Sequence, residues 1–130
     1  MSITFRVNHE RRELYTIAEG PVTLTEILSH LEEEREARGL GYAELIDASK
    51  ATVNVSPRDV RILVDLLREL GNDGKLGPAA IGVGDELAFG MIRMLQTLLE
   101  DVAVIRPFRN FADAEAWFQS VRESDGVRRG

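Results

Sequence analysis

Residues 42–47, YAELID, form a short and mostly apolar run. Such a run is typical of an interior strand of a parallel sheet, whose two faces are both buried. A similar run, PAAIGVG, occupies residues 78–84. Amphipathic helical patterns precede, separate and follow the two runs, so the sequence predicts strands and helices that alternate along the chain.

A signal for a helix start precedes each of the helical patterns. Side chains of Ser, Thr, Asp and Asn accept hydrogen bonds from the free backbone N–H groups at a helix start, and proline fits the first helical position. Such signals stand at Thr23 with Glu26, at Ser56 with Pro57, at Asp85 and at Asn110. The sequence therefore predicts four helices, with the third over residues 85–100 and the fourth from residue 111.

The N-terminal part contains two further strand patterns. ITFRVN (residues 3–8) alternates apolar and polar residues, and ELYTIAEG (residues 13–20) follows after a short polar turn, which favours an antiparallel hairpin. DVAVIRPF (residues 101–108) supplies the last strand. The predicted fold is α/β in the order β-β-α-β-α-β-α-β-α, with a mainly parallel sheet and an antiparallel N-terminal strand. We expect one domain over residues 1–123 and a polar tail over residues 124–130.

The composition excludes several classes of function. The 130 residues contain no cysteine, which excludes disulfides and thiol chemistry and suits the cytoplasm. A net charge of −6 argues against general nucleic-acid binding. The N-terminus does not resemble a signal peptide, and no segment approaches the roughly 20 apolar residues that cross a bilayer.

The element order and several short stretches carry a family resemblance. EGPVTLTEIL, LIDASKA, ELAFGMIRMLQ and FADAEAWF resemble the SpoIIAA-like branch of small uncharacterised bacterial proteins, which is grouped with STAS and Sec14-type domains. The resemblance covers nearly the whole chain. It implies a SpoIIAA-like (STAS) fold and a domain that binds partners or small ligands without a metal or redox cofactor.

The same resemblance singles out the stretch after the strand at 42–47. In anti-sigma-factor antagonists a serine in an Asp-Ser-Ser/Thr-Gly stretch is phosphorylated at a helix start. Asp47 matches the aspartate, Ser49 matches the phosphoacceptor, and Lys50 stands where the family has glycine. Because the capping signal comes later, at Ser56, we expect Ser49 in a loop over residues 48–56 that contacts a ligand or partner.

The predicted helix over residues 85–100 has an apolar stripe wider than one covered face requires. Flexible methionines suit an adaptable partner surface or the wall of an apolar pocket. Packing against neighbouring helices would also explain the stripe, and an ion pair would explain its arginine. The candidate interface or pocket residues are Phe89, Met91, Ile92, Arg93 and Met94.

No motif in the sequence demands a reaction. His9 and His30 have no partner at an evident metal-ligand spacing, and neither has an obvious nucleophile for a triad, so we expect no metal site, no cofactor and no catalytic residue. An unrecognised hydrolase is the remote alternative.

Two functions remain open. The first is a non-catalytic regulatory or protein-interaction domain that uses the loop over residues 48–56 and the helix over residues 85–100, with a homodimer as one form of the interaction. The alternative is a carrier or sensor of a small apolar or acyl ligand, of Sec14-like type, in which Arg93 or Lys50 meets an acidic head group.

Overall fold

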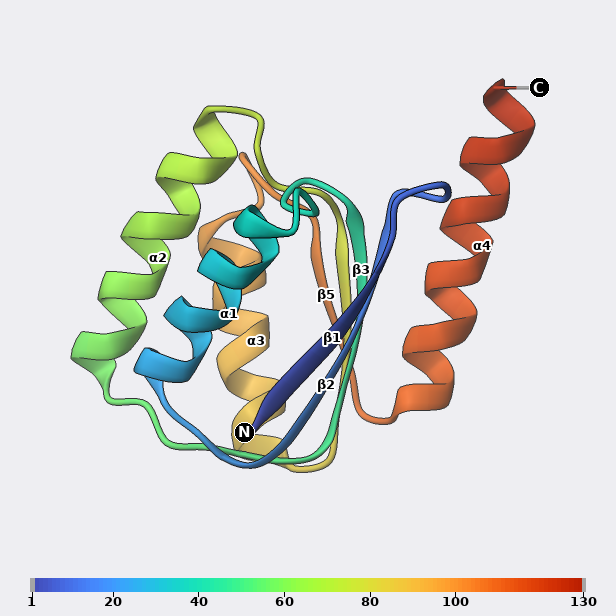
Figure 1. Ribbon diagram of the computed structural model, residues 1–130. Coiled ribbons are helices and arrows are strands. Elements are labelled where there is room, and N and C mark those ends of the chain that lie inside the picture. Colours follow the sequence, from blue (N-terminus) through green and yellow to red (C-terminus); the bar gives the residue numbers. More distant parts are fainter. Residues whose placement is uncertain (1, 130) are drawn as a thin grey trace.

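The structure is a computed structural model that describes the backbone of residues 2–129 and the side chains of residues 2–124. Its elements follow the predicted order (Figure 1). They are β1 (Ile3–Asn8), β2 (Glu13–Val22), α1 (Leu24–Glu36), β3 (Ala43–Val53), α2 (Pro57–Asn72), β4 (Ala79–Val83), α3 (Glu86–Leu98), β5 (Ile105–Phe108) and α4 (Phe111–Arg129).

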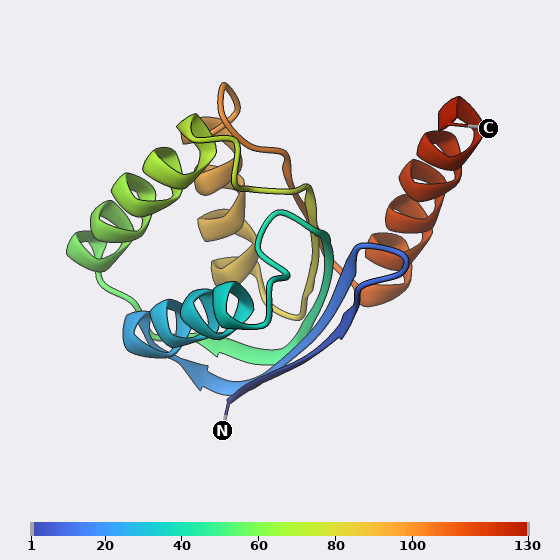
Figure 2. The same ribbon diagram turned by 45° about the horizontal axis from the view of Figure 1, so that its top comes forward.

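The five strands form one mixed sheet in the order β1-β2-β3-β4-β5. β1 is antiparallel to β2, and the other neighbours are parallel, as the sequence predicts. Each parallel crossover moves one strand further in the same direction, and right-handed crossovers of that kind put their helices on the same face. Accordingly α1, α2 and α3 cover one face of the sheet and α4 covers the other (Figures 1 and 2).

The predicted caps are confirmed at all four helix starts. The Thr23 hydroxyl accepts from the N–H of Glu26, and the Asp85 carboxylate accepts from the N–H of Ala88. The side chain of Asn110 accepts from the N–H of Asp113 at 2.8 Å. At Ser56 the capping box is complete, and Pro57 takes the first helical position.

The sheet separates two hydrophobic cores. Between the sheet and α1–α3, the buried residues are Leu63, Val83, Ala88, Ile92, Leu95 and Leu99. Between the sheet and α4, they are Ala43, Leu45, Ala80, Ala114 and Phe118. Alternate residues of β3 therefore face different cores, as the two-residue period of a strand requires.

The predicted loop over residues 48–56 is wrong for most of its length, because β3 continues to Val53. Beyond Asp47 the strand pairs with the end of β2, from Glu19↔Lys50 to Val22↔Val53. The register shifts between Ile17 and Glu19, which leaves Ala48 and Ser49 in a β-bulge. Ser49, Lys50 and Thr52 make this extension polar, so it lacks the apolar pattern that indicates a buried strand.

Two other boundaries differ from the predictions. β5 begins at Ile105 rather than at residue 101, and α4 continues through the segment expected as a tail as far as Arg129. Within the described part of the chain, no helix has the length and apolar character needed to cross a membrane.

Candidate functional site

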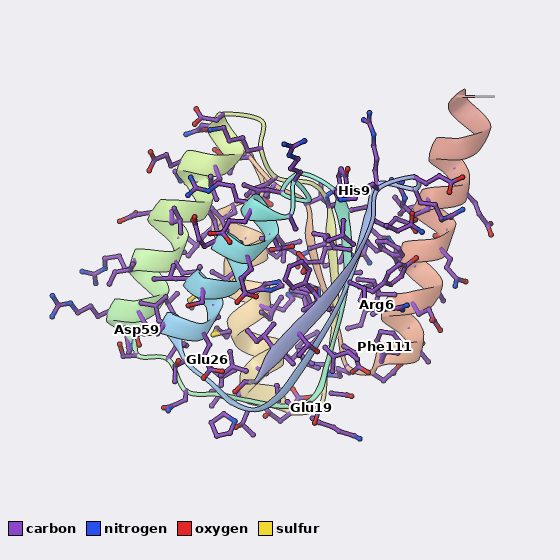
Figure 3. All side chains as sticks on the ribbon, in the orientation of Figure 1. Arg6, His9, Glu19, Glu26, Asp59 and Phe111 are labelled. Carbon is purple, nitrogen blue, oxygen red and sulfur yellow. The ribbon has the colours of Figure 1, made fainter. Side chains whose placement is uncertain are left out.

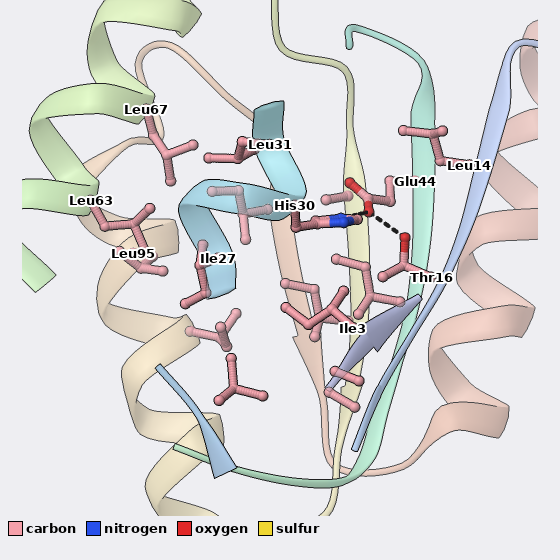
Figure 4. Close-up of a pocket in the computed structure, with 18 of the residues that line it drawn as sticks. Ile3, Leu14, Thr16, Ile27, His30, Leu31, Glu44, Leu63, Leu67 and Leu95 are labelled. Carbon is pink, nitrogen blue, oxygen red and sulfur yellow. Dashed lines mark hydrogen bonds and ion pairs between the residues drawn. The ribbon is translucent and has the colours of Figure 1, made fainter. Parts of the chain in front are cut away.

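A cavity of about 230 Å³ lies between the sheet and helices α1–α3 (Figure 4). Its wall is mainly aliphatic and draws on every element of this layer. Ile27 and Leu31 of α1 and Leu63 and Leu67 of α2 belong to it, with strand residues opposite them. Apolar walls favour an apolar guest, because such a guest leaves water without losing hydrogen bonds.

One part of the wall is polar and buried. His30 and Glu34 stand four residues apart on α1 and hence on the same face of that helix, while Glu44 projects from β3 towards them. Their side chains are exposed by only 9%, 2% and 14%. We call these three residues the His30–Glu34–Glu44 cluster.

Short contacts hold the cluster together. His30 Nε2 lies 3.0 Å from Glu44 Oε2 and 3.3 Å from Glu34 Oε1. The Thr16 hydroxyl on β2 donates to the same oxygen of Glu44 at 2.6 Å, as Figure 4 shows. The ring of Phe5 meets the imidazole edge-on, with centroids 5.3 Å apart. The imidazole orientation is therefore set from three sides.

The two carboxyl groups of the cluster differ in their pKa. Burial, together with the facing Glu44, raises the pKa of Glu34 to about 10. Burial also opposes the charge on Glu44, but hydrogen bonds from His30, Thr16 and Glu34 outweigh it and lower the pKa of that carboxyl. At neutral pH Glu44 is the ionised member and Glu34 the protonated one.

The cluster does not have the order of a catalytic triad. In a triad the imidazole lies between the hydroxyl and the carboxylate, so that it can take the hydroxyl proton. Here Glu44 lies between Thr16 and His30. The Thr16 hydroxyl is thus bound to a carboxylate and not to the imidazole, an arrangement that suits binding more than nucleophilic attack.

Another buried glutamate lies on the opposite face of the sheet. Glu13 on β2 is only 1% exposed, and Arg11 and Arg122 each approach one of its oxygens at 2.9 Å. The Tyr15 hydroxyl donates to it at 2.7 Å. Burial alone would raise the pKa of Glu13, but these hydrogen bonds outweigh burial and hold the pKa below its ordinary value. This group ties α4 to β2.

The predicted residues of α3 divide between the cavity and the surface. Met91 and Ile92 line the cavity. Phe89 is half-buried, and the Arg109 guanidinium lies 3.9 Å from the centre of its ring. Arg93 and Met94 are exposed and do not line the cavity.

The outer side of α3 carries three exposed apolar residues, Leu87, Met94 and Leu98. Their spacing of seven and four residues puts them on one face of the helix. We call them the outer stripe of α3.

Asp47 itself does not line the cavity, although its neighbours Ile46 and Ala48 do. Asp47 borders an open hollow beside α4 with Arg6, Tyr15 and Phe111, on the side of the sheet where Figure 3 labels Arg6 and Phe111. Its carboxylate accepts from both the N–H and the hydroxyl of Ser49, at 3.1 and 2.6 Å. These bonds brace the bulge.

The three other positions of the predicted contact loop are exposed. Ser49 and Lys50 lie within β3, and Ser56 caps α2. Ser49 as a phosphoacceptor stays a prediction, but it lies in a strand and not at a helix start. Gly84 packs so closely on Ser49 that a Cβ there would overlap the Ser49 carbonyl oxygen, which gives the glycine a packing role.

The sequence does not predict Glu34 and Glu44 as site residues. The four-residue spacing of His30 and Glu34 was a usable signal, because residues at that spacing share a helix face. Glu44 was visible as a charged residue inside an otherwise apolar strand. What the sequence could not supply is the register that brings β3 under this turn of α1.

Comparison with known proteins supports the fold. The structure is similar to the crystal structure of an uncharacterised protein from the DUF3478 family, with a SpoIIAA-like fold, from Shewanella loihica PV-4. The TM-score is 0.60 at 18% sequence identity, and the match covers 90% of this chain and 93% of that one. No protein-family model and no curated protein matches the sequence. The chain therefore has a SpoIIAA-like α/β fold.

Proposed function

We propose that the protein binds a small, mainly apolar ligand in the cavity between the sheet and α1–α3, as a carrier or sensor. The observation that carries this proposal is a cavity of about 230 Å³ with aliphatic walls and one polar cluster. Ligand sites combine an apolar lining with a few polar groups that fix orientation. An interior built only for stability is packed to near-crystalline density, with few voids larger than a water molecule.

The size of the cavity limits the ligand. Sites for drug-sized molecules measure about 300–1,000 Å³. Dry cavities of about 150 Å³ accept benzene. A volume of about 230 Å³ therefore suits a bicyclic aromatic compound or a short acyl chain.

The polar cluster limits the chemistry of the ligand's polar end. Glu44, the ionised carboxylate of the cluster, would repel a carboxylate placed beside it, and Arg93 and Lys50, the cations predicted for an acidic head group, do not line the cavity. The unloaded cavity therefore favours a ligand whose polar end donates a hydrogen bond. We infer a binding role and not a catalytic one, because the Thr16 hydroxyl is engaged by Glu44.

Two experiments test ligand binding. Native mass spectrometry of gently purified protein is expected to show a co-purifying small molecule. If the protein carries none, added indole should bind and raise the mass by that of one molecule. In calorimetry, indole should bind with a Kd of about 1 mM or lower, since nine heavy atoms at roughly 0.5 kcal/mol each suffice for that affinity.

A matched pair of variants locates the binding. Leu31→Phe adds a ring at the cavity wall and should abolish indole uptake, whereas Leu87→Phe makes the same change at the exposed surface and should leave it intact. Equal indole binding by both variants, or none by the wild type, would remove the proposal.

A second candidate function is a regulatory protein-interaction domain, homodimeric in one form. The outer stripe of α3 supports it, since Leu87 is 71% exposed and its two companions are exposed on the same face. Light scattering after size-exclusion chromatography tests self-association. A mass above that of one chain which Met94→Asp reduces to one chain would support the dimer, and a monomer at all concentrations would exclude it.

A further inference from the structure

The His30–Glu34–Glu44 cluster brings three metal-ligating side chains to one point of the cavity wall. Each offers one donor atom, and the three donor atoms lie within 4.8 Å of one another. One imidazole nitrogen with carboxylate oxygens is the donor set that Zn²⁺ and its first-row neighbours accept, whereas Mg²⁺ and Ca²⁺ prefer oxygen alone. We propose that the cluster binds a Zn²⁺-like divalent cation, with a further coordination position open to the cavity.

The spacing of the donors favours a metal ion over an organic cation. Zinc–nitrogen and zinc–oxygen bonds are about 2.0–2.2 Å long, so tetrahedral donors stand roughly 3.3–3.5 Å apart. An ammonium ion that donates hydrogen bonds of about 2.8 Å would hold its acceptors roughly 4.6 Å apart. His30 Nε2 lies 3.0 and 3.3 Å from its two carboxylate partners, which fits the metal.

The surroundings of the cluster give a second and independent reason. Within the described residues, no arginine or lysine forms an ion pair with Glu34 or Glu44. His30 Nδ1 has no hydrogen-bond partner within the described residues, and Nε2 is the ring nitrogen that faces the two carboxyl groups. Two carboxyl groups without an arginine or lysine partner, together with the imidazole Nε2, form a site whose charge a dication would balance.

The arrangement also has the features of an open metal site. Three protein donors leave at least one position of a zinc ion for water or a ligand. The Thr16 hydroxyl donates a hydrogen bond to Glu44 Oε2. It would orient this carboxylate as a metal ligand, as outer hydrogen-bond partners do in metal sites. All three donors line the cavity, so the free position faces the ligand.

A bound cation would change which ligand the cavity accepts. Without it, the ionised Glu44 favours a hydrogen-bond donor at the ligand's polar end. With it, the positive charge favours an acceptor atom, and a carboxylate becomes acceptable. The metal site does not depend on the proposed apolar ligand, because Zn²⁺ can be titrated alone.

Zinc titration of protein stripped with EDTA tests the proposal. We expect one Zn²⁺ per chain by calorimetry, retained after desalting and detected by elemental analysis, with Ca²⁺ failing to compete. His30→Gln and Glu34→Gln should each weaken binding by more than about tenfold. The matched controls His9→Gln and Glu36→Gln alter an exposed histidine and an exposed glutamate of α1, and should bind as the wild type does.

Co²⁺ provides a readout of coordination geometry, because coordinated Co²⁺ absorbs visible light with an intensity set by its geometry. That absorption should appear in the wild type and in both controls. It should be absent from Glu34→Gln, and circular dichroism verifies that this variant is folded. Glu34→Gln therefore carries the test if His30→Gln fails to fold. Equal zinc binding by Glu34→Gln and the wild type, or no stoichiometric zinc in the wild type, would overturn the proposal and leave the ligand-binding proposal standing.

Discussion

Two buried glutamate groups lie on neighbouring strands and face opposite sides of the sheet. Glu13 on β2 pairs with Ala43, and the next residue pair, Leu14↔Glu44, brings the second group to the other face. Two arginines and a tyrosine contact the carboxylate of Glu13 through ion pairs and a hydrogen bond. Glu44 is met by Thr16, His30 and a second carboxyl group.

The difference between the two groups separates structure from function. A buried carboxylate whose charge and lone pairs are met by the protein holds the fold together, and its removal costs stability. A buried carboxylate at a cavity wall without an arginine or lysine partner is poor as a structural element, because no fixed cation balances its charge. Under the proposed function, such a group serves to bind a ligand.

The largest expected effect concerns Glu13. Glu13→Gln removes the charge that Arg11 and Arg122 share, and should lower the free energy of unfolding by about 3 kcal/mol. Urea denaturation measures the change. Glu19→Gln, an exposed change on the same strand, is the control and should stay within about 0.5 kcal/mol. A loss below that control value would mean that the Glu13 group does not hold α4 to the sheet.

The contribution of Glu13 should depend on pH. Its folded pKa lies below the ordinary value of 4.5, so its stabilisation is fully present above about pH 4.5 and is lost as the pH falls through the folded pKa. The difference in unfolding free energy between wild type and Glu13→Gln should therefore shrink on acidification from pH 7 towards pH 3. A difference that grows in this range would contradict the lowered pKa.

A smaller effect is expected at Thr16. Thr16→Val removes the hydroxyl that donates to Glu44 at 2.6 Å and should cost about 1.5 kcal/mol of stability, since hydrogen bonds to charged groups contribute about that much. Thr4→Val, on the exposed side of β1, is the matched control. Equal stability of the two variants in urea would show that Thr16 does not support the cluster.

The smallest effect on stability is expected at Glu34. In protein stripped of metal, Glu34→Gln removes one of two facing buried carboxyl groups that have no arginine or lysine partner, so stability should change by less than about 1 kcal/mol or rise. The same substitution at Glu13 is expected to cost about 3 kcal/mol, so urea denaturation of the two variants distinguishes the two groups. A loss comparable with that at Glu13 would assign both groups to structure.

The sequence predicted the scaffold better than the site. Helix starts at Ser56 and Asp85 rest on local hydrogen bonds between neighbouring residues, and alternation along the chain gives the layer order. The extension of β3 past Asp47 depends on pairing with the end of β2, which no local pattern reveals. His30 and Glu34 share a helix face that is visible in the sequence, but their meeting with Glu44 depends on how α1 lies over the sheet.

The most direct test of the central claim is a nuclear magnetic resonance titration of the protein with indole, in which amide shifts near both glutamate groups are followed together. We expect saturable shifts at His30, Glu34 and Glu44 and none at Glu13 and Arg122. Shifts centred on Glu13, or no saturable shift at the His30–Glu34–Glu44 cluster, would contradict the claim that the cavity beneath α1 is the binding site.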